Sequence, residues 1–451
     1  MSAIYERNAG YEILHVVANI ATHCHYQRTV IRGRENLPQD GIYILAPCHQ
    51  NALMEPMALM ASLSGCTVFL ARADIFANPT IRAILTFFKI LPVYRIRDGK
   101  SNLSKNEAIF EQSCQVLLHG VPLCLMAEGR HNDRHQLLPL VKGMFRIAGE
   151  AQRSLGDTPL YIVPTGIDFD HYERPYSCLV VDIGTPIAIK PFMECYEHEE
   201  PVALNQMRNA LTTALKRQMH HIESHKYYDE VYLLCQILNP AWRAAHHRAD
   251  TAWQRFVTRR DIAMRINEMD PDTSETTPEY IVLAHEYAAT CRKRHLDPVT
   301  AAHPWHPLLT LLVTVAIASV AAAIVALPEA WHAFRWILLC NPLIVIPTHL
   351  IAQLLIQDTQ FRSSVNYGIR LVLSVLYAVG LTIAVACSCG IVWGVAALAT
   401  LLISARINAV VHPLLRRWIY NLHRLVVGVT HPAVLRRLRQ IQQTLQSTIR
   451  A

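Results

Sequence analysis

Charged side chains are scarce in this sequence. Asp, Glu, Lys and Arg make up 17% of its 451 residues, against roughly 25% in most soluble proteins. The deficit is concentrated late in the chain, where residues 307–328 contain no charged side chain at all. A run of that length is enough to cross a hydrocarbon core of roughly 30 Å. The chain is therefore predicted to join a soluble part to a membrane part.

Several motifs are also missing. The twelve cysteines include no CxxC pair, so we expect reduced thiols in a protein that faces the cytosol. The sequence contains no zinc-finger spacing or RNA-binding aromatic motif, which argues against a nucleic-acid partner. It also lacks the HExxH motif of zinc metalloproteases. The formal net charge of +7 suits the anionic head groups of a membrane surface instead.

Two groups of histidines raise the question of a metal site. His220, His221 and His225, and separately His246 and His247, have spacings that metal ligands can adopt on a helix. No acidic or cysteine partner completes either set. We therefore expect solvated helix faces at these positions and no metal.

The N-terminal segment, 1–27, is predicted to form an amphipathic helix. Over 11–24, apolar side chains follow one helical stripe that is interrupted by His15, Asn19 and His23. This pattern is unlike the uniform apolar core of a signal peptide. The helix is expected either to lie on a bilayer surface or to pack on the soluble domain.

Residues 28–190 alternate between short β-rich runs and helical stretches, with turn sequences between them. Such alternation predicts an α/β sheet covered by helices. The expected strands are 29–32, 42–46, 67–71, 121–127, 161–165 and 178–183, and the expected helices lie near 54–63, 79–88, 101–119 and 141–153.

Residues 191–300 have helical periodicity and few strand signals, so we predict an all-helical extension whose main loop is 270–277. A transmembrane region of about four spans is predicted over 305–410. Its uncharged runs are 307–328, 336–357 and 371–405, and the last, which is too long for one span, is expected to turn near 387–390.

Four spans would place Arg362, Arg370 and Arg406 on the same side of the membrane as the soluble domain, in agreement with the positive-inside rule. Residues 411–451 are predicted to form a basic amphipathic tail. Its helix, 431–449, is expected to rest on the same leaflet.

The first motif with chemical potential is a histidine followed by an acid. His49 stands six residues before Glu55, directly after the apolar run 41–45. A carboxylate at that spacing can hold an imidazole in the tautomer that a general base needs. Taken alone, the pair is also typical of a hydrogen-bonded turn.

Three further segments carry groups that suit an anion. Arg95 and Arg97 alternate beyond an apolar run, so both side chains would point to one face of a continued strand. Another predicted strand ends in Glu128-Gly129-Arg130, where glycine permits a tight turn and the close approach of a ligand. Lys142 and Gly143 open a predicted helix, and a lysine beside the free amides at a helix start can bind an anion.

Together these segments resemble the glycerolipid acyltransferase family, which includes the 1-acylglycerol-3-phosphate acyltransferases. The family orders its motifs as a histidine–acid pair, an arginine-bearing strand, a Glu-Gly turn and a proline-bearing strand end, and the resemblance covers about 30–190. It implies that His49 and Glu55 are catalytic. It implies substrate-binding roles for Asn51, Arg95, Arg97, Glu128, Gly129, Arg130, Lys142 and Pro164.

The sequence departs from the family pattern at three places. Five residues separate His49 from its acid where four are commoner, and the acid is glutamate instead of aspartate; Asn51 fits a longer HxNxxxD variant. Lys89 stands where glycine is usual, and Arg130-His131 replaces the usual Thr-Arg pair.

The resemblance implies a membrane-bound O-acyltransferase without a cofactor. It would move a fatty acyl group from acyl-CoA or acyl-carrier protein to the hydroxyl of a lysophospholipid or of glycerol 3-phosphate. Its expected partners are the acyl donor and membrane lipids. The expected location is an integral membrane protein whose catalytic domain faces the cytoplasm, in the inner membrane if the cell is bacterial.

Three alternatives stay open. The acceptor could be another lysolipid, such as an amino-acid-derived one, or the protein could be a non-catalytic lipid-binding module that retains the fold. A transporter would rest on the four spans alone, which lack ionisable residues apart from His349. The sequence predicts no oligomeric state.

Overall fold

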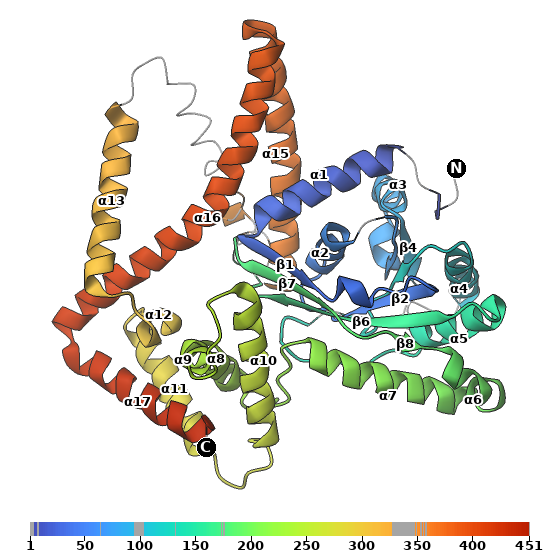
Figure 1. Cartoon of the computed structure of the whole chain (residues 1–451), viewed down its shortest axis with the longest axis horizontal. Coiled ribbons are helices and arrows are strands. Elements are labelled where there is room, and N and C mark those ends of the chain that lie inside the picture. The colour runs from blue at the N-terminus through green and yellow to red at the C-terminus, as the bar shows by residue number, and fades with distance from the viewer. Residues whose placement is uncertain are drawn as a thin grey trace.

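In the computed structural model, the chain consists of a sheet domain, a helical extension and a group of long C-terminal helices (Figure 1). The sheet domain and the extension lie side by side, and two of the long helices stand upright from the top of the sheet domain. The structure describes residues 4–6, 9–63, 65–93, 103–130, 132–172, 174, 176–326, 348, 350–351, 354, 356 and 359–450.

A mixed sheet of eight strands forms the centre of the sheet domain. Its order is β1-β7-β6-β2-β5-β3-β4, and β8 pairs with β6. Strand β6 runs antiparallel to β7 and β8, whereas the other neighbours are parallel. The strands are β1 (Arg28–Arg32), β2 (Ile42–Pro47), β3 (Val68–Arg72), β4 (Ile90–Val93), β5 (Leu123–Cys124), β6 (Leu160–Phe169), β7 (Cys178–Ile183) and β8 (Ile187–Ala188).

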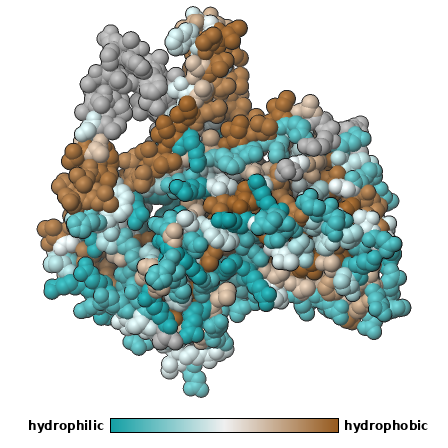
Figure 2. All heavy atoms as spheres, in the orientation of Figure 1, coloured by the Kyte–Doolittle hydropathy of each residue, from teal (hydrophilic) through white to brown (hydrophobic). Residues whose placement is uncertain are grey.

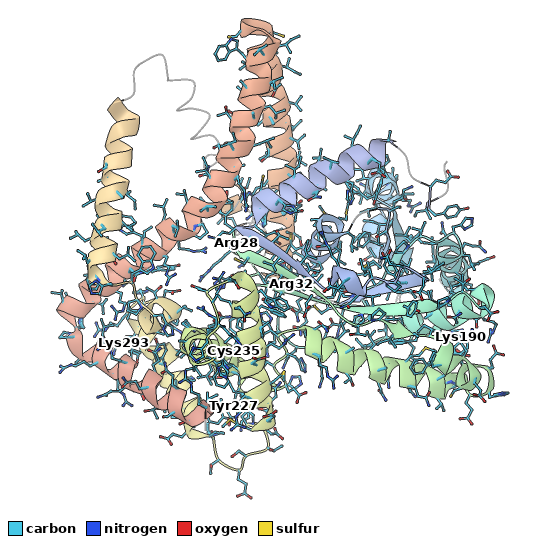
Figure 3. The ribbon with its side chains drawn as sticks, viewed as in Figure 1. Arg28, Arg32, Lys190, Tyr227, Cys235 and Lys293 are labelled. Atoms are coloured by element: carbon cyan, nitrogen blue, oxygen red, sulfur yellow. The ribbon has the colours of Figure 1, made fainter. Side chains whose placement is uncertain are left out.

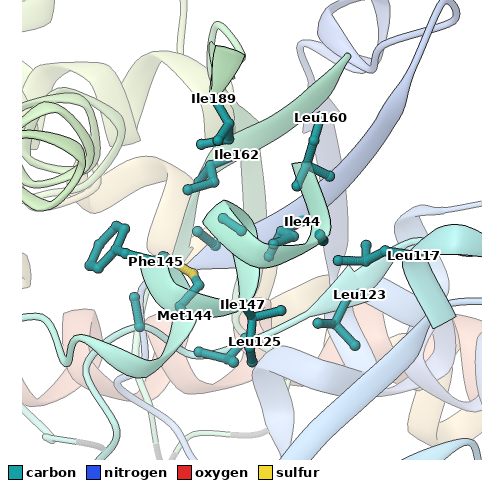
Figure 4. Close-up of a cluster of buried hydrophobic side chains, with 14 of the residues drawn as sticks. Ile44, Leu117, Leu123, Leu125, Met144, Phe145, Ile147, Leu160, Ile162 and Ile189 are labelled. Atoms are coloured by element: carbon teal, nitrogen blue, oxygen red, sulfur yellow. The ribbon is translucent and has the colours of Figure 1, made fainter. Parts of the chain in front are cut away.

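Helices cover both faces of this sheet (Figure 1). On one face Ile44 packs with Met144 and Leu117 in a buried apolar cluster (Figure 4), and on the other face Leu45 packs with Met54. Consecutive residues of β2 thus enter opposite cores, because successive side chains of a strand alternate between its faces. The covering helices are α1 (Ala9–His25), α2 (Met54–Ser62), α3 (Pro79–Phe87), α4 (Leu103–Leu118), α5 (Gly143–Leu155), α6 (Met193–His198) and α7 (Glu200–Gln218).

The predicted α/β sheet covered by helices is confirmed, with differences in strand length. The strand expected over 121–127 is paired only at β5, because the chain turns away toward Glu128 and Gly129. Strand β6 is longer than expected, since its second half continues as a hairpin with β7. Strand β4 lies in the apolar run from which a strand was expected to continue to Arg95 and Arg97. Strand β8 was not predicted, because it is two residues long and has no alternating pattern to detect.

The all-helical extension is also confirmed, and its loop at 270–277 lies between two helices as predicted. The second core of the protein gathers here, around Val231, Ile262 and Tyr287; Tyr227 and Cys235, labelled in Figure 3, belong to it. The helices of the extension are α8 (Tyr228–Ile237), α9 (Asn239–Ala245), α10 (Ala252–Glu268), α11 (Glu279–Lys293) and α12 (Pro298–Ala302).

Within the described residues, the C-terminal helices contain two candidate membrane spans, Phe361–Cys389 and Ile391–Thr430, and a shorter apolar helix, Pro307–Ser319. The long uncharged run breaks at Gly390, whose φ of +99° favours glycine, so the turn predicted near 387–390 is confirmed. The helices on either side are long, not short as expected. The elements are α13 (Pro307–Ala326), α15 (Thr359–Cys389), α16 (Ile391–Thr430) and α17 (Pro432–Arg450).

Other expectations for this region have mixed outcomes. The predicted span 336–357 lies almost entirely outside the described residues. Helix α16 runs through residue 411, where the predicted tail was to begin. The helix expected to rest on a leaflet over 431–449 does not present its apolar side to a membrane. That side, with Leu438, Ile441 and Leu445, is buried in the core of the extension.

The N-terminal helix combines the two alternatives set out for it. Helix α1 packs on the sheet domain through Tyr11 and Ala18, which are both 2% exposed. Its opposite side exposes Ile13, Val16 and Ile20. The helix is therefore seated on the protein and still presents an apolar stripe outward.

Candidate active site

The candidate site lies at the end of β2, in the short loop between that strand and α2. The loop leaves the sheet at Cys48, whose backbone N–H donates to the Thr165 carbonyl at 3.1 Å. The Cys48 thiol is buried and lies against Ile167 of β6. Carboxyl ends of parallel strands are the usual place for a ligand site in α/β sheets, and His49 follows directly.

His49 and Glu55 face each other as the sequence predicts. Nδ1 of His49 lies 3.4 Å from Oε2 of Glu55, which is fully buried, while the His49 side chain is 15% exposed. The other oxygen of Glu55 accepts hydrogen bonds from the backbone N–H groups of Gln50 (2.9 Å) and Asn51. Because α2 begins at Met54, Glu55 lies in the first helical turn and closes back over the loop. The pair is slightly longer than a formed hydrogen bond, as is common at catalytic sites without substrate.

Glu128 holds this loop from the neighbouring strand end. One of its carboxylate oxygens accepts from the His49 backbone N–H and the other from the Leu138 N–H, each at 2.8 Å. Glu128 is buried, and burial raises the pKa of this carboxyl group to about 7 although the two backbone hydrogen bonds act in the opposite direction. Both oxygens are thus engaged by the backbone of the protein.

Gly129 adopts a φ of +64°, which glycine tolerates best. A Cβ atom at this position would lie 3.0 Å from Cγ1 of Val141, and the Val141 N–H donates to Ala127 at 2.8 Å. These contacts place the turn after β5 against the segment that enters α5. As a result the exposed side chains of Arg130 and Lys142 belong to two adjoining turns.

The adjoining turns also connect to the loop between β2 and α2, residues 48–53, which carries His49 and is called the catalytic loop below. The backbone N–H of Asn132, two residues beyond Arg130, donates to the His49 carbonyl at 3.2 Å. Helix α5 starts at Gly143, as predicted from Lys142-Gly143. Arg95 and Arg97 lie outside the described residues.

Two predicted substrate-binding residues are buried. Asn51 is 2% exposed, and its side-chain amide donates to the Tyr172 carbonyl at 3.4 Å. Pro164 lies inside the sheet, paired with Ala46 of β2, and its carbonyl accepts from Gly184 at 2.8 Å. Both residues help to shape the sheet end and the loop above it.

A contact from far along the chain was missed by sequence reasoning. The backbone N–H of Leu53, in the catalytic loop, donates to the hydroxyl of Ser364 in α15 at 3.0 Å. The preceding residue, Ala52, has a φ of +46°, a strained value for a residue with a side chain. The base of α15 thus supports the loop at its most strained point, and no local pattern around Ser364 signals this.

Two further residues of α15 fix the same helix to the sheet domain. Tyr367 is 2% exposed and its hydroxyl lies 3.0 Å from Oγ1 of Thr22 in α1. Arg370 donates to the Tyr176 hydroxyl at 3.1 Å. On α16, Arg406 donates to the backbone carbonyls at the end of α1, those of His23, Tyr26 and Gln27.

The prediction of solvated helix faces is wrong for the first histidine group. His220 and His221 follow the end of α7 and are 1% and 8% exposed, because this segment passes between the sheet domain and the extension. His225, His246 and His247 are exposed.

Comparison with known proteins finds an acyltransferase match in the first half of the chain. The family model described as Acyltransferase matches residues 28–168. An uncharacterised acyltransferase of Schizosaccharomyces pombe is 29% identical over 90 residues, which are 20% of this chain and 13% of that protein. The match therefore spans only a small part of the relative's length.

Among solved structures, the 1-acyl-sn-glycerophosphate acyltransferase PlsC of Thermotoga maritima aligns with a TM-score of 0.31 and 16% identity. That alignment covers 46% of this chain and 83% of PlsC. The family match spans the sheet from β1 to the end of β6 and includes His49, Glu55, Glu128 and Pro164. On this match, the chain carries an acyltransferase domain at residues 28–168.

Proposed function

We propose that this protein is a membrane-bound O-acyltransferase that transfers a fatty acyl group to the hydroxyl of a lysophospholipid or of glycerol 3-phosphate. The observation that carries this proposal is the pairing of His49 with a fully buried Glu55 at the end of β2, inside the acyltransferase domain. The donor would be a thioester, acyl-CoA or acyl-carrier protein.

We assign different tasks to the two nitrogens of His49. Nδ1 faces Glu55, which favours the tautomer with its proton on Nδ1 and leaves Nε2 to take a proton. As the acceptor hydroxyl attacks the thioester carbonyl, its proton passes to Nε2 and the new C–O bond forms. The C–S bond then breaks, and the departing thiolate takes from His49 the proton that the acceptor hydroxyl gave up.

The role of Glu55 is to stabilise the imidazolium that exists between these two transfers. Its second oxygen is held by two backbone N–H groups of the same loop, so the carboxylate cannot rotate away from the histidine. Glu128 fixes the His49 backbone from the other side. We therefore assign Glu128 a positioning role in place of the substrate contact that the family resemblance implies.

We propose that the exposed side chains of Arg130 and Lys142, beside the loop, bind the phosphate of the acceptor. Arg130 and Lys142 lie on adjoining turns, and the first of these turns is tied to the His49 carbonyl through Asn132. A guanidinium can engage a phosphate through two parallel hydrogen bonds, and lysine adds a point charge. Arg95 and Arg97 are proposed for the same task on the basis of the sequence.

A lipid substrate requires the active site to sit close to a bilayer. The upright pair of α15 and α16 is apolar over its upper part (Figure 2), with Leu376 64% and Val392 80% exposed. Exposure of large apolar side chains on this scale suits hydrocarbon better than water. We propose that the pair enters the membrane and that the apolar stripe of α1 meets the surface of the same leaflet.

Acyl transfer can be tested directly. Purified full-length protein would be given labelled acyl-CoA or acyl-carrier protein with a panel of acceptors, including glycerol 3-phosphate, lysophospholipids and an amino-acid-derived lysolipid. Acylation of a phosphorylated acceptor, lost in His49→Ala, is the expected result. Acylation of the unphosphorylated lysolipid alone would reject the proposed acceptor class, and no acylation at all would favour a lipid-binding module.

Membrane orientation needs a separate experiment. The end of α17 is packed into the extension through Leu445 and Ile449, so a cysteine placed at residue 450 should share its side of the membrane with the sheet domain. Labelling with an impermeant thiol reagent is expected only from the cytoplasmic side, in a background from which the exposed Cys387 and Cys389 have been removed. Labelling from outside in intact cells would reject the proposed orientation.

A further inference from the structure

A cluster of buried ligand-type side chains lies behind the catalytic loop. It consists of His135, which precedes α5, Asp168 near the end of β6, and His220, which follows α7. One ligand atom from each residue lies within 4.8 Å of the other two. The residues are 3%, 2% and 1% exposed. Three segments that are distant in sequence thus bring imidazole and carboxylate groups to one enclosed point.

Several polar atoms of this cluster have no hydrogen-bond partner within the described part of the chain. They are both ring nitrogens of His220 and Oδ1 of Asp168. A buried polar group without a partner costs about 1–3 kcal/mol, and most such groups in folded proteins are satisfied by protein, water or an ion. Oδ1 of Asp168 and one ring nitrogen of His220 can meet in the cluster, and their lack of a partner points to an occupant.

The local charge balance also admits a cation. Arg259 donates to Oδ2 of Asp168 at 2.5 Å and to Asp170 at 2.8 Å, so two carboxylates face its single positive charge. Arg255 lies 3.8 Å from Asp170, but its closer partner is Asp250 at 2.9 Å. Asp250 also pairs with Arg243 at 3.1 Å, so the three arginines and three aspartates of this network sum to zero and leave no excess positive charge to repel an ion. The oxygen of Asp168 that Arg259 does not engage is the one turned toward His135.

From this arrangement we propose that His135, Asp168 and His220 bind a divalent transition-metal ion of the zinc type. Two imidazoles and one carboxylate are characteristic zinc ligands, whereas calcium and magnesium prefer oxygen donors alone. Since the Tyr172 hydroxyl engages Nδ1 of His135 at 3.1 Å, the ring nitrogen left for the ion is Nε2, and one ligand atom of each residue lies within 4.8 Å of the other two. A water molecule would complete the coordination.

The position of the site indicates a structural role. His220 belongs to the joint between the sheet domain and the helical extension, and Arg259 comes from α10 of that extension. The Tyr172 hydroxyl lies 3.1 Å from Nδ1 of His135 and donates to the side chain of Gln50 at 2.8 Å. Gln50 is the neighbour of His49. A bound ion would thus fasten the extension to the sheet domain and hold the back of the catalytic loop, whatever acyl acceptor the enzyme uses.

The metal content of the full-length protein tests this inference. The protein would be purified in detergent with a histidine-free affinity tag, and its zinc would be measured by mass spectrometry. About one zinc per chain is expected. After chelation, we expect a lower melting temperature that recovers on addition of Zn²⁺, and Co²⁺ should produce the intense visible bands of a tetrahedral site with imidazole ligands.

Two variants locate the ion. His220→Ala should lose the metal and the Co²⁺ spectrum, and His225→Ala, which removes an exposed histidine from the same segment, should retain both. The inference is overturned if the wild-type protein holds no metal and neither Zn²⁺ nor Co²⁺ changes its melting temperature or spectrum. It is overturned equally if a folded His220→Ala protein binds as much metal as the wild type.

Discussion

The contact between Ser364 and the catalytic loop offers the sharpest test of how the long C-terminal helices serve the active site. Ser364→Ala removes the hydroxyl that accepts from the Leu53 N–H at 3.0 Å. The loop would then have to keep Ala52 at a φ of +46° without this support. Because such conformations persist only where the surroundings enforce them, the loop should relax and carry His49 away from its reactive position.

The size of the effect follows from the environment of the bond. A fully buried N–H left without a partner costs about 1–3 kcal/mol, but the Leu53 residue is 41% exposed and water can replace part of the lost bond. A cost near 1 kcal/mol is therefore expected. If it falls on the reactive conformation, it lowers kcat by about fivefold, with little change in the KM for the acyl donor and a melting temperature shifted by only a few degrees.

Steady-state kinetics on the purified protein would measure kcat and KM separately. Ser364→Thr keeps the hydroxyl and should recover most of the activity, while Ser363→Ala makes the same change one residue earlier on α15 and serves as the matched control. A wild-type kcat in Ser364→Ala would refute the reasoning. So would equal losses in the two alanine variants, which would mean that the helix and not this hydrogen bond matters.

Other predictions concern the site itself. His49→Ala should lower kcat by about 10²–10⁴-fold in a protein that still folds, and Glu55→Gln should lower it less, as acyl-transfer rates would show; near-normal turnover in His49→Ala rules out the proposed base. The pKa of Glu128 is raised to about 7, so the folded chain retains a proton that the unfolded chain releases near pH 4.5, and this group makes stability fall as pH rises between those values. Denaturant unfolding of Glu128→Gln should lack that slope, of at most about 1.4 kcal/mol per pH unit. Arg130→Ala should raise the KM for a phosphorylated acceptor more than that for the acyl donor, and equal changes in the two constants would reject a phosphate contact.

Much of the sheet domain was predictable because its signals are local. Apolar runs such as 42–46 and 178–183 are bounded by turn residues, and each forms a strand close to its predicted limits. The break at Gly390 was also predictable, because glycine adopts a positive φ readily whatever its distant contacts are. The pairing of His49 with Glu55 was predictable for the same reason, since both lie within one loop and the first turn of the helix that follows.

What escaped prediction depends on contacts between distant segments. Glu128 was expected to meet substrate, but its two oxygens are occupied by backbone N–H groups of His49 and Leu138, and only the fold brings the first of these to it. His220 was expected to be solvated, since no acidic or cysteine partner completes a set with it in the sequence. Its partners in the fold, Asp168 and His135, come from β6 and from the segment before α5. A sequence shows which groups are available but not which of them burial will force together.

The same distinction applies to the C-terminal helices, which contact the candidate active site as well as providing candidate membrane spans. A membrane anchor needs only length and apolar composition, both of which are visible in the sequence. Here the base of α15 and α16 also contributes Ser364 to the catalytic loop, Tyr367 to the core beneath it, and Arg406 to the end of α1. These three contacts fix the height of His49 relative to the apolar part of the helices. If that part lies in the bilayer, the distance between the reacting imidazole and the membrane surface is set by packing within the protein.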